Sequence, residues 1–276
     1  MKALALAALL AAAPLAAGAA ERIVSVGGSV TETIAALGAL DRVVARDTTS
    51  SWPEEVEALP DVGYVRRLSP EGVLSVAPDL ILAEEGAGPP ETVAVLERAE
   101  IPFVTVPDAT DAAGVARKVE AVGVALGLEA RAAALAERIE TRIAETAARA
   151  AAVETPARVL FVLSAEGGRL LASGSDTAAA AMIDLAGGVN AVTGFEGYKP
   201  LTDEAVLAAA PDVVLMMEGR AEGHGGAGVL SHPALAATPA GRAGRLVEMD
   251  GLYLLGFGPR TAEAVADLHA ALYPGG

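Results

Sequence analysis

The sequence predicts an α/β protein of two lobes joined by a helical segment, and three patterns support this prediction. Short runs of β-branched residues alternate with helical patterns rich in Ala and Leu on both sides of the middle of the chain. The middle, from Asp111 to Val153, holds almost no strand signal and no proline. A motif then recurs once in each half. Continuous apolar strands between helices indicate parallel sheets with helices on both faces.

Residues 1–20 have the features of a secretory signal peptide. Lys2 precedes an uncharged run of Ala and Leu that ends in Ala17-Gly18-Ala19, a small-residue pattern typical of a cleavage site. The alternative is a membrane anchor, but the apolar run before Pro14 is too short to span a bilayer. We therefore expect the mature protein to begin just after this segment and to be exported.

The composition excludes several classes of function. The 276 residues include 36 acidic and 20 basic side chains, for a formal net charge of −16, whereas a nucleic-acid-binding face needs clustered Lys and Arg. The absence of cysteine excludes disulfides, thiolate metal sites and cysteine nucleophiles. An acidic, soluble, cysteine-free exported protein suits a bacterial periplasm.

The first lobe is expected at residues 21–110. Its strand patterns lie at 22–26, 42–45, 79–83 and 102–106, and helical patterns lie between them at 30–37 and 90–99. The second lobe is expected at residues 155–276. Its strand patterns lie at 157–163, 212–216 and 245–248, with a helical pattern at 176–185.

A helical linker is expected between the lobes, at residues 111–154. Its second part is rich in Ala, Glu and Arg, and Leu135, Ile139 and Ile143 follow one another at intervals of four, which indicates a long amphipathic helix. Thr155-Pro156 ends this helix. A helical joint bends less than flexible strands, so we expect small lobe closure when a ligand binds.

The repeated motif covers residues 68–82 and 201–215. Eight of the fifteen positions are identical at a constant offset of 133. Ser69 and Thr202 are expected to cap a short helix in each copy, and Glu71 and Glu204 then lie in its first turn. The helix dipole favours an anion there, which alone explains the two glutamates. The functional alternative is a matched pair of surface carboxylates, one on each lobe, for a partner with two-fold symmetry.

Loops that leave the C-terminal ends of the strands should line a cleft between the lobes. Two of the candidate loops hold a tyrosine close to cations, Tyr64 with Arg66 and Arg67, and Tyr198 with Lys199. A neutral phenol is a poor metal ligand, but a ferric ion can hold it as phenolate, and arginine stabilises that charge. On chemistry alone, Tyr64 is either such a ligand or a packed or surface aromatic.

Long segments of the chain resemble the periplasmic hemin-binding proteins of bacterial haem ABC importers. They are LPDVGYVRRLSPEGVLSVAPDLIL at 59–82, LAGGVNAVTGFEGYKPLTDEAVLAAAPDVVLMM at 185–217 and TPAGRAGRLVEMDGLYLLGFGPRTAEA at 238–264. The similarity covers almost the whole mature chain in order. It implies two Rossmann-like lobes joined by a single long backbone helix, the fold shared by siderophore- and cobalamin-binding proteins.

The resemblance also implies roles for individual residues. Tyr64 matches the axial ligand of the haem iron, and Arg66 would help to neutralise phenolate or propionate charge. Arg67 is a further candidate for ligand binding because it lies close to Tyr64 in the sequence. A further arginine that follows the Met-Met pair of the second lobe matches Arg220, one place later than in relatives. His224 is either a second iron ligand or a solvent-facing side chain. By residue type alone, and not from the resemblance, Trp52, Tyr198 and Phe257 are candidates for apolar walls around a flat macrocycle.

The function implied is capture of ferric haem in the cleft and delivery to an inner-membrane ABC permease with its ATPase. Glu71 and Glu204 match the two glutamates that dock on the permease in this class. A TonB-dependent outer-membrane receptor is expected upstream, the protein is expected to be a monomer, and no nucleic acid is involved. No catalysed reaction is expected, because the sequence offers no convergent acid–base pair. The alternative is a siderophore or cobalamin carrier on the same fold, in which Tyr64 would be a wall residue.

Overall fold

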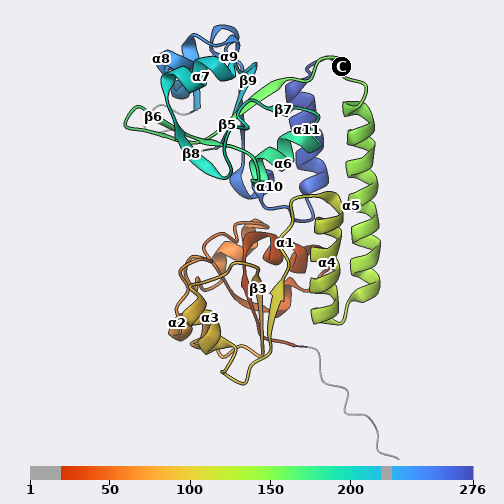
Figure 1. The fold of residues 1–276 in the computed structure, drawn as a ribbon. Coiled ribbons are helices and arrows are strands. Elements are labelled where there is room, and N and C mark those ends of the chain that lie inside the picture. Colours follow the sequence, from red (N-terminus) through yellow and green to blue (C-terminus); the bar gives the residue numbers. More distant parts are fainter. Residues whose placement is uncertain (1–19, 219–225, 276) are drawn as a thin grey trace, which may run out of the picture.

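Two α/β lobes lie one above the other beside a hairpin of two helices (Figure 1) in a computed structural model that describes residues 20–218 and 226–275. The N-terminal lobe is the lower one in this view, and the helix α5 passes alongside both lobes. Within the part of the chain described, helices fall short of the length and apolarity that crossing a membrane requires.

The N-terminal lobe contains a parallel sheet with the strand order β2-β1-β3-β4. The central strands β1 (Ile23–Val26) and β3 (Leu80–Glu84) are buried along almost their whole length, as expected for strands covered on both faces. The edge strands are β2 (Val43–Arg46) and β4 (Phe103–Val106). The helices are α1 (Gly28–Ala36), α2 (Pro70–Leu74) and α3 (Pro90–Leu96), with 3-10 turns at Leu40–Arg42 and Glu54–Ala58.

The linker is a helical hairpin of α4 (Ala112–Leu126) and α5 (Glu129–Ala150). The helix α4 begins at its cap Asp111 and ends at Gly127, whose φ of 69° lies in the left-handed region. The expected apolar stripe of α5 is confirmed, because Leu135, Ile139 and Ile143 are buried. The helix α5 packs against α4 and also against α11 (Thr261–Leu272) of the C-terminal lobe. The amphipathic helix predicted from the sequence therefore connects the two lobes.

The C-terminal lobe has a mixed sheet with the order β10-β9-β5-β6-β8, and β7 pairs with β5. All three expected strands are present, as β5 (Arg158–Glu166), β9 (Val213–Met217) and β10 (Leu246–Met249). Three further strands were not predicted, β6 (Arg169–Ser173), β7 (Val189–Asn190) and β8 (Tyr198–Leu201). The strand β6 runs antiparallel to β5 and β8, so this sheet is not purely parallel. The helices are α6 (Ala178–Leu185), α7 (Asp203–Ala209), α8 (Pro233–Ala236), α9 (Pro239–Ala243) and α10 (Gly251–Leu255), with a 3-10 turn at Gly226–Ser231.

The two copies of the repeated motif fold alike. The short helices α2 and α7 begin at the predicted caps, since the Ser69 hydroxyl accepts from the Gly72 N–H at 3.0 Å and the Thr202 hydroxyl accepts from the Ala205 N–H at 3.2 Å. Each helix is followed by a strand of the sheet, β3 or β9. The internal repeat is therefore a repeat of structure as well as of sequence.

In each lobe, an arginine at the beginning of the first strand forms hydrogen bonds with the C-terminal end of the repeated helix. Arg22 donates to the carbonyls of Val76 and Ala77, and Arg158 donates to the carbonyl of Ala209. The backbone N–H groups of both arginines donate, each at 2.9 Å, to the aspartate that follows the motif's proline, Asp79 or Asp212. The helices that carry Glu71 and Glu204 are thus attached to their sheets in the same way.

The contact between α4 and α5 gives a stability prediction. A Cβ placed on Gly123 would lie 2.2 Å from the Cβ of Ala132, so Gly123→Val forces the two helices apart. We expect a loss of about 1–3 kcal/mol in the free energy of unfolding, measured by urea denaturation. Ala113→Val adds a valine at an exposed position of α4 and should change it by less than about 0.5 kcal/mol. Equal stability of the two variants would contradict close packing of the hairpin.

Candidate functional site

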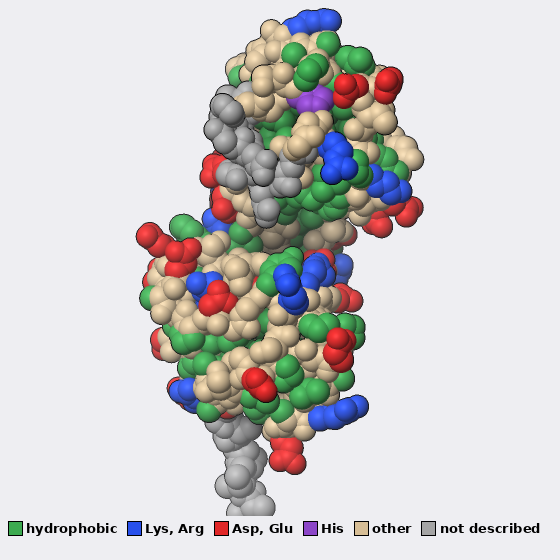
Figure 2. Space-filling view, turned by 90° about the vertical axis from the view of Figure 1, so that its left-hand side faces the viewer, with side chains coloured by type: hydrophobic (Ala, Val, Ile, Leu, Met, Phe, Trp, Pro, Cys, Tyr) green, Lys and Arg blue, Asp and Glu red, His purple; other side chains and the backbone are tan. Residues whose placement is uncertain are grey.

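A cleft with a volume of about 960 Å³ lies between the lobes. Its walls are mainly the segments that follow β1, β2 and β4 in one lobe and β6, β9 and β10 in the other, together with the end of β3. These are the C-terminal ends of the strands, where the sequence analysis expects the cleft, and Leu163 of β5 and Tyr198 at the start of β8 add to the lining. Figure 2 shows the face opposite the helical hairpin, with the molecule narrowed between its two lobes.

Tyr64 lines the cleft from the N-terminal lobe, and its side chain is 45% exposed. Val62 and Val65 on either side of it are buried in the lobe's core, so the loop is fixed and Tyr64 is left at the surface. Gly63 between them has a φ of 102°, a conformation that favours glycine. Two core residues and one glycine therefore direct a single aromatic side chain to the cleft.

The two arginines that follow Tyr64 occupy different environments. Arg66 lines the cleft, and its guanidinium donates to the carbonyl of Gly86 at 3.1 Å, which places a cation in the same wall as Tyr64. Arg67 is exposed and does not line the cleft, and its backbone N–H closes the turn by donating to the Tyr64 carbonyl at 2.7 Å. Of the two, Arg66 has the position that the sequence analysis expected.

Tyr198 lines the cleft from the opposite lobe, at the start of β8. Its ring packs edge-on against Phe161, with the ring centroids 6.3 Å apart. Burial raises the pKa of the Tyr198 phenol, against hydrogen bonds with Thr177 and Ala179 that lower it. Tyr198 thus forms part of the cleft wall, and its surroundings favour the neutral form of the phenol.

Two expected wall residues lie elsewhere. Phe257 is 1% exposed and belongs to the core shared by the lobes, so it cannot form a wall of the cleft. The glycines around it suggest an exposed loop, but its φ of 47° turns the side chain inward. Trp52 is exposed outside the cleft lining, and its ring lies 4.4 Å from the guanidinium carbon of Arg260. Phe257 is therefore a core residue and not a wall residue, whereas Trp52 lies outside the cleft lining with its ring exposed, and its wall role stays a prediction.

The remaining candidates are Arg220 and the three histidines of the sequence. Arg220 and His224 lie outside the described residues. His232 caps α8, and His269 contacts the carbonyl of Ala186 at 2.9 Å, so both have structural roles. Across residues 20–218 and 226–275, no group of three or more His, Asp or Glu side chains is placed to hold a bare metal ion.

The turn at Gly27-Gly28, which could be an anion site or a tight turn, is a tight turn in the structure. The Gly27 N–H donates to the buried carboxylate of Asp47 at 2.8 Å, and the Gly28 N–H donates to the hydroxyl of Thr49 at 3.1 Å. The backbone N–H groups that an anion would need are therefore already hydrogen-bonded to side chains of the protein.

A buried ammonium group lies at the floor of the cleft and was not predicted. Lys118 of α4 is 0% exposed, and its Nζ donates to Ser29 at 2.9 Å and to Glu84 at 2.8 Å, both of which line the cleft. Asp108, also in the cleft lining, lies 3.5 Å from the same nitrogen. The signal in the sequence is a lysine on the apolar face of a helix, three residues after the buried Val115.

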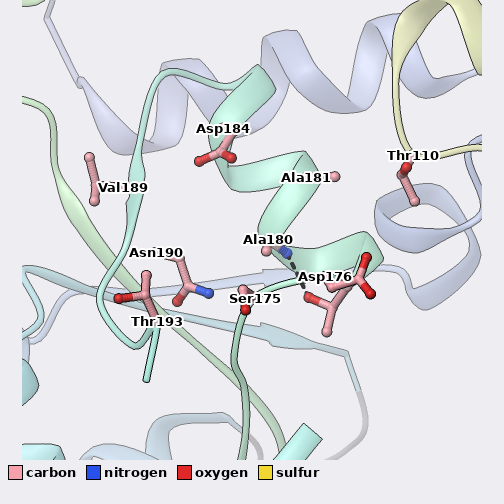
Figure 3. A pocket seen from close by; sticks show the side chains of 10 residues that line it. Thr110, Ser175, Asp176, Ala180, Ala181, Asp184, Val189, Asn190 and Thr193 are labelled. Carbon is pink, nitrogen blue, oxygen red and sulfur yellow. Dashed lines mark hydrogen bonds between the residues drawn. The ribbon is translucent and has the colours of Figure 1, made fainter. Parts of the chain in front are cut away.

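A smaller side pocket of about 320 Å³ adjoins the cleft and shares the lining residues Thr110, Asp176 and Thr177 with it. Figure 3 shows Thr110 of the N-terminal lobe facing the start of α6, with Asp184 and Asn190 farther along the pocket. Burial raises the pKa of the Asp184 carboxyl. This pocket has both polar and apolar lining residues and about a third of the volume of the cleft, so it is a side recess of the main site.

The two lobes, the helical hairpin and the cleft at the strand ends agree with a known class of proteins. The chain belongs to the periplasmic binding protein family, whose model matches residues 23–252. Over 258 residues it is 28% identical to YvrC, an uncharacterized ABC transporter substrate-binding lipoprotein of Bacillus subtilis (strain 168), which covers 92% of this chain and 80% of the relative.

Two solved structures are similar along nearly the whole chain. One is the periplasmic heme-binding protein BhuT in complex with two hemes, with 44% identity, a TM-score of 0.86 and coverage of 91% of this chain and 97% of that chain. The other is the periplasmic heme-binding protein RhuT from Roseiflexus sp. RS-1 in apo form, with 42% identity, a TM-score of 0.87 and coverage of 92% and 98%. The expected two-lobed fold of a substrate-binding protein is therefore confirmed.

The corrected position of Phe257 can be tested by truncation. Phe257→Ala should lower the free energy of unfolding by about 3–5 kcal/mol, because it leaves a cavity in the core. Tyr64→Ala removes a half-exposed ring and should lower it by less than about 1 kcal/mol. Denaturant unfolding measures both values, and similar small losses in the two variants would return Phe257 to the cleft surface.

Proposed function

We propose that the protein binds ferric haem in the interlobe cleft and passes it to an inner-membrane ABC permease with its ATPase. The observation that carries this proposal is a tyrosine directed into the cleft, Tyr64, with a guanidinium in the same wall, Arg66. The likeness to two heme-binding proteins along more than nine-tenths of the chain supports it. Haem is here the transported substrate, and no reaction is proposed.

The chemistry of ferric haem matches the two walls of the cleft. A ferric iron accepts a phenolate as an axial ligand, and the Tyr64 phenol is accessible for this role. Arg66 supplies positive charge beside it, which stabilises phenolate and can pair with a propionate carboxylate. The opposite wall offers apolar and aromatic surface to a flat macrocycle, from Leu163, Tyr198, Met217, Leu252 and Leu255.

Delivery is proposed to use Glu71 and Glu204. Both side chains are exposed in the first turn of the repeated helices α2 and α7, which lie on the same side of the two lobes, away from the helical hairpin (Figure 1). The pKa of the Glu204 carboxyl is lowered, chiefly by its own backbone N–H and then by Thr202, so it remains charged. Two equivalent carboxylates on two equivalent helices suit a permease with two-fold symmetry.

The place of the protein in the cell follows from the same proposal. Removal of residues 1–20 would release the chain into the periplasm, where we propose that it acts as a monomer. A TonB-dependent outer-membrane receptor would supply haem to it.

The identity of the iron ligand is tested with two matched variants. Tyr64→Phe should remove the phenolate-to-iron charge-transfer absorption of the hemin complex, because the ligand oxygen is lost while the ring remains. Tyr198→Phe removes a phenol from the facing wall and should leave that absorption in place. Titration with hemin, followed by absorbance, measures both. Loss of the band in Tyr198→Phe, but not in Tyr64→Phe, would show that the iron ligand comes from the C-terminal lobe and would contradict our proposal.

The titration of the unaltered protein also separates the two carrier functions. A changed hemin spectrum that saturates supports haem as the substrate. An unperturbed spectrum rejects haem binding and favours the alternative, a siderophore or cobalamin carrier with Tyr64 as a wall residue.

Docking is tested by reversing both charges. Glu71→Arg combined with Glu204→Arg should abolish hemin uptake by proteoliposomes that contain the permease, while hemin affinity stays unchanged because neither residue lines the cleft. The control Glu120→Arg with Glu140→Arg makes the same change in net charge on exposed positions of the hairpin. Uptake that survives in the first variant, or is lost equally in the control, contradicts docking through these glutamates.

A further inference from the structure

The loop at residues 256–260 of the C-terminal lobe meets the N-terminal side of the molecule through a buried cation. Lys118 reaches this loop from α4 and donates from Nζ to the carbonyl of Gly256 at 3.3 Å. Its other hydrogen-bond acceptors, Ser29 and Glu84, belong to the N-terminal lobe, as does Asp108, whose carboxylate lies 3.5 Å from the same nitrogen. An ammonium group has three N–H donors, so these three acceptors satisfy it. One buried side chain therefore joins both lobes to the helical hairpin.

The other end of the same loop meets a buried anion. Glu32 of α1 is 3% exposed, and its carboxylate accepts from the Arg260 backbone N–H at 2.8 Å and from the Arg260 guanidinium at 2.9 Å. The approach is close, since a Cβ on Gly258 would lie 3.2 Å from Glu32 Oε1. Burial raises the pKa of the Glu32 carboxyl, although the contacts with Arg260 lower it. Arg260, from the opposite lobe, thus offsets part of the desolvation of Glu32.

Aromatic rings complete the contact at Arg260. Its guanidinium carbon lies 4.4 Å from the ring centroid of Trp52 in the N-terminal lobe and 5.0 Å from that of Tyr253 in its own lobe. Such cation–π contacts are stabilising at partly buried sites. Trp52, which does not line the cleft, therefore has a structural partner across the lobe boundary.

This set of contacts is continuous with the floor of the cleft. Ser29, Glu84 and Gly256 bond to Lys118 and also line the cleft. If the lobes separated here, Lys118 would lose the carbonyl of Gly256 as an acceptor, and Glu32 would lose its salt bridge with Arg260. A buried charge left without its partner is strongly unfavourable. For Glu32 the loss would leave a buried charge without its partner from the C-terminal lobe, whereas Lys118 would keep its salt bridge with Glu84 and lose one hydrogen bond.

We propose that Lys118 and Glu32 are positioning residues that hold the loop 256–260 and so keep the Tyr64 and Tyr198 walls at the separation the ligand needs. This inference rests on haem binding for its ligand, but the lobe arrangement it describes exists without ligand. The helical hairpin limits how far the lobes move, and the two charges select one separation within that range.

The experiment compares Lys118→Met, Glu32→Gln and Arg260→Gln with the unaltered protein. Small-angle X-ray scattering of the ligand-free proteins measures the radius of gyration, and stopped-flow transfer of hemin to apomyoglobin measures hemin dissociation. Arg142→Gln is the control, because Arg142 forms an exposed salt bridge from α5 to Glu263 of α11. Circular dichroism shows which variants are folded at the temperature used. If Lys118→Met and Glu32→Gln are unfolded, the test relies on Arg260→Gln, which alters a partly exposed side chain.

We expect a larger radius of gyration in the three variants than in the control. Hemin dissociation should be faster by about tenfold or more, because affinity differences among variants of one protein arise mainly from the dissociation rate. The absorption band of the tyrosine-bound iron should persist, since Tyr64 itself is unchanged. Folded variants with the radius and dissociation rate of the unaltered protein would overturn the inference. If the unaltered protein binds no hemin, the proposed function is wrong. The scattering of the ligand-free proteins still tests whether the two charges set the lobe separation.

Discussion

An ammonium group with no exposed surface lies where the two lobes and the helical hairpin meet. Because Lys118 is inaccessible to water, its charge has to be satisfied by Ser29, Glu84 and Gly256, and these acceptors come from both lobes. The rest of the site depends on this arrangement. Tyr64 and Tyr198 belong to separate lobes, so their relative position is only as well defined as the contact between those lobes.

The internal repeat explains how the surface of each lobe is built as well as its core. The same hydrogen bonds fix α2 and α7 to their sheets, with an arginine at the helix end and an aspartate at the start of the next strand. Glu71 and Glu204 occupy equivalent positions on these helices. The helix dipole explains why a carboxylate is favourable at each position, and duplication explains why there are two.

Much of the fold could be predicted because buried parallel strands and amphipathic helices have strong patterns. The apolar runs at β1, β3, β5 and β9 and the stripe on α5 are examples. The strand β8 is short, largely exposed and contains Pro200, so it has neither alternation nor an apolar run. Tyr64 was placed in the cleft by chemistry and resemblance. The position of Phe257 could not be predicted, because a positive φ is not visible in the sequence. The contacts of Lys118 could not be predicted either, because Ser29 and Gly256 are 89 and 138 residues away from it in the sequence.

The loop that carries Tyr64 has a consequence for protein engineering. Val62 and Val65 fix the backbone on both sides, Gly63 provides the turn, and only the side chain at position 64 projects. Substitution of residue 64 changes the donor atom that a bound metal complex meets, without repacking the core beneath the loop. The chain is therefore a suitable scaffold for artificial metalloproteins, in which imidazole, thioether or carboxylate donors are compared in one unchanged enclosure.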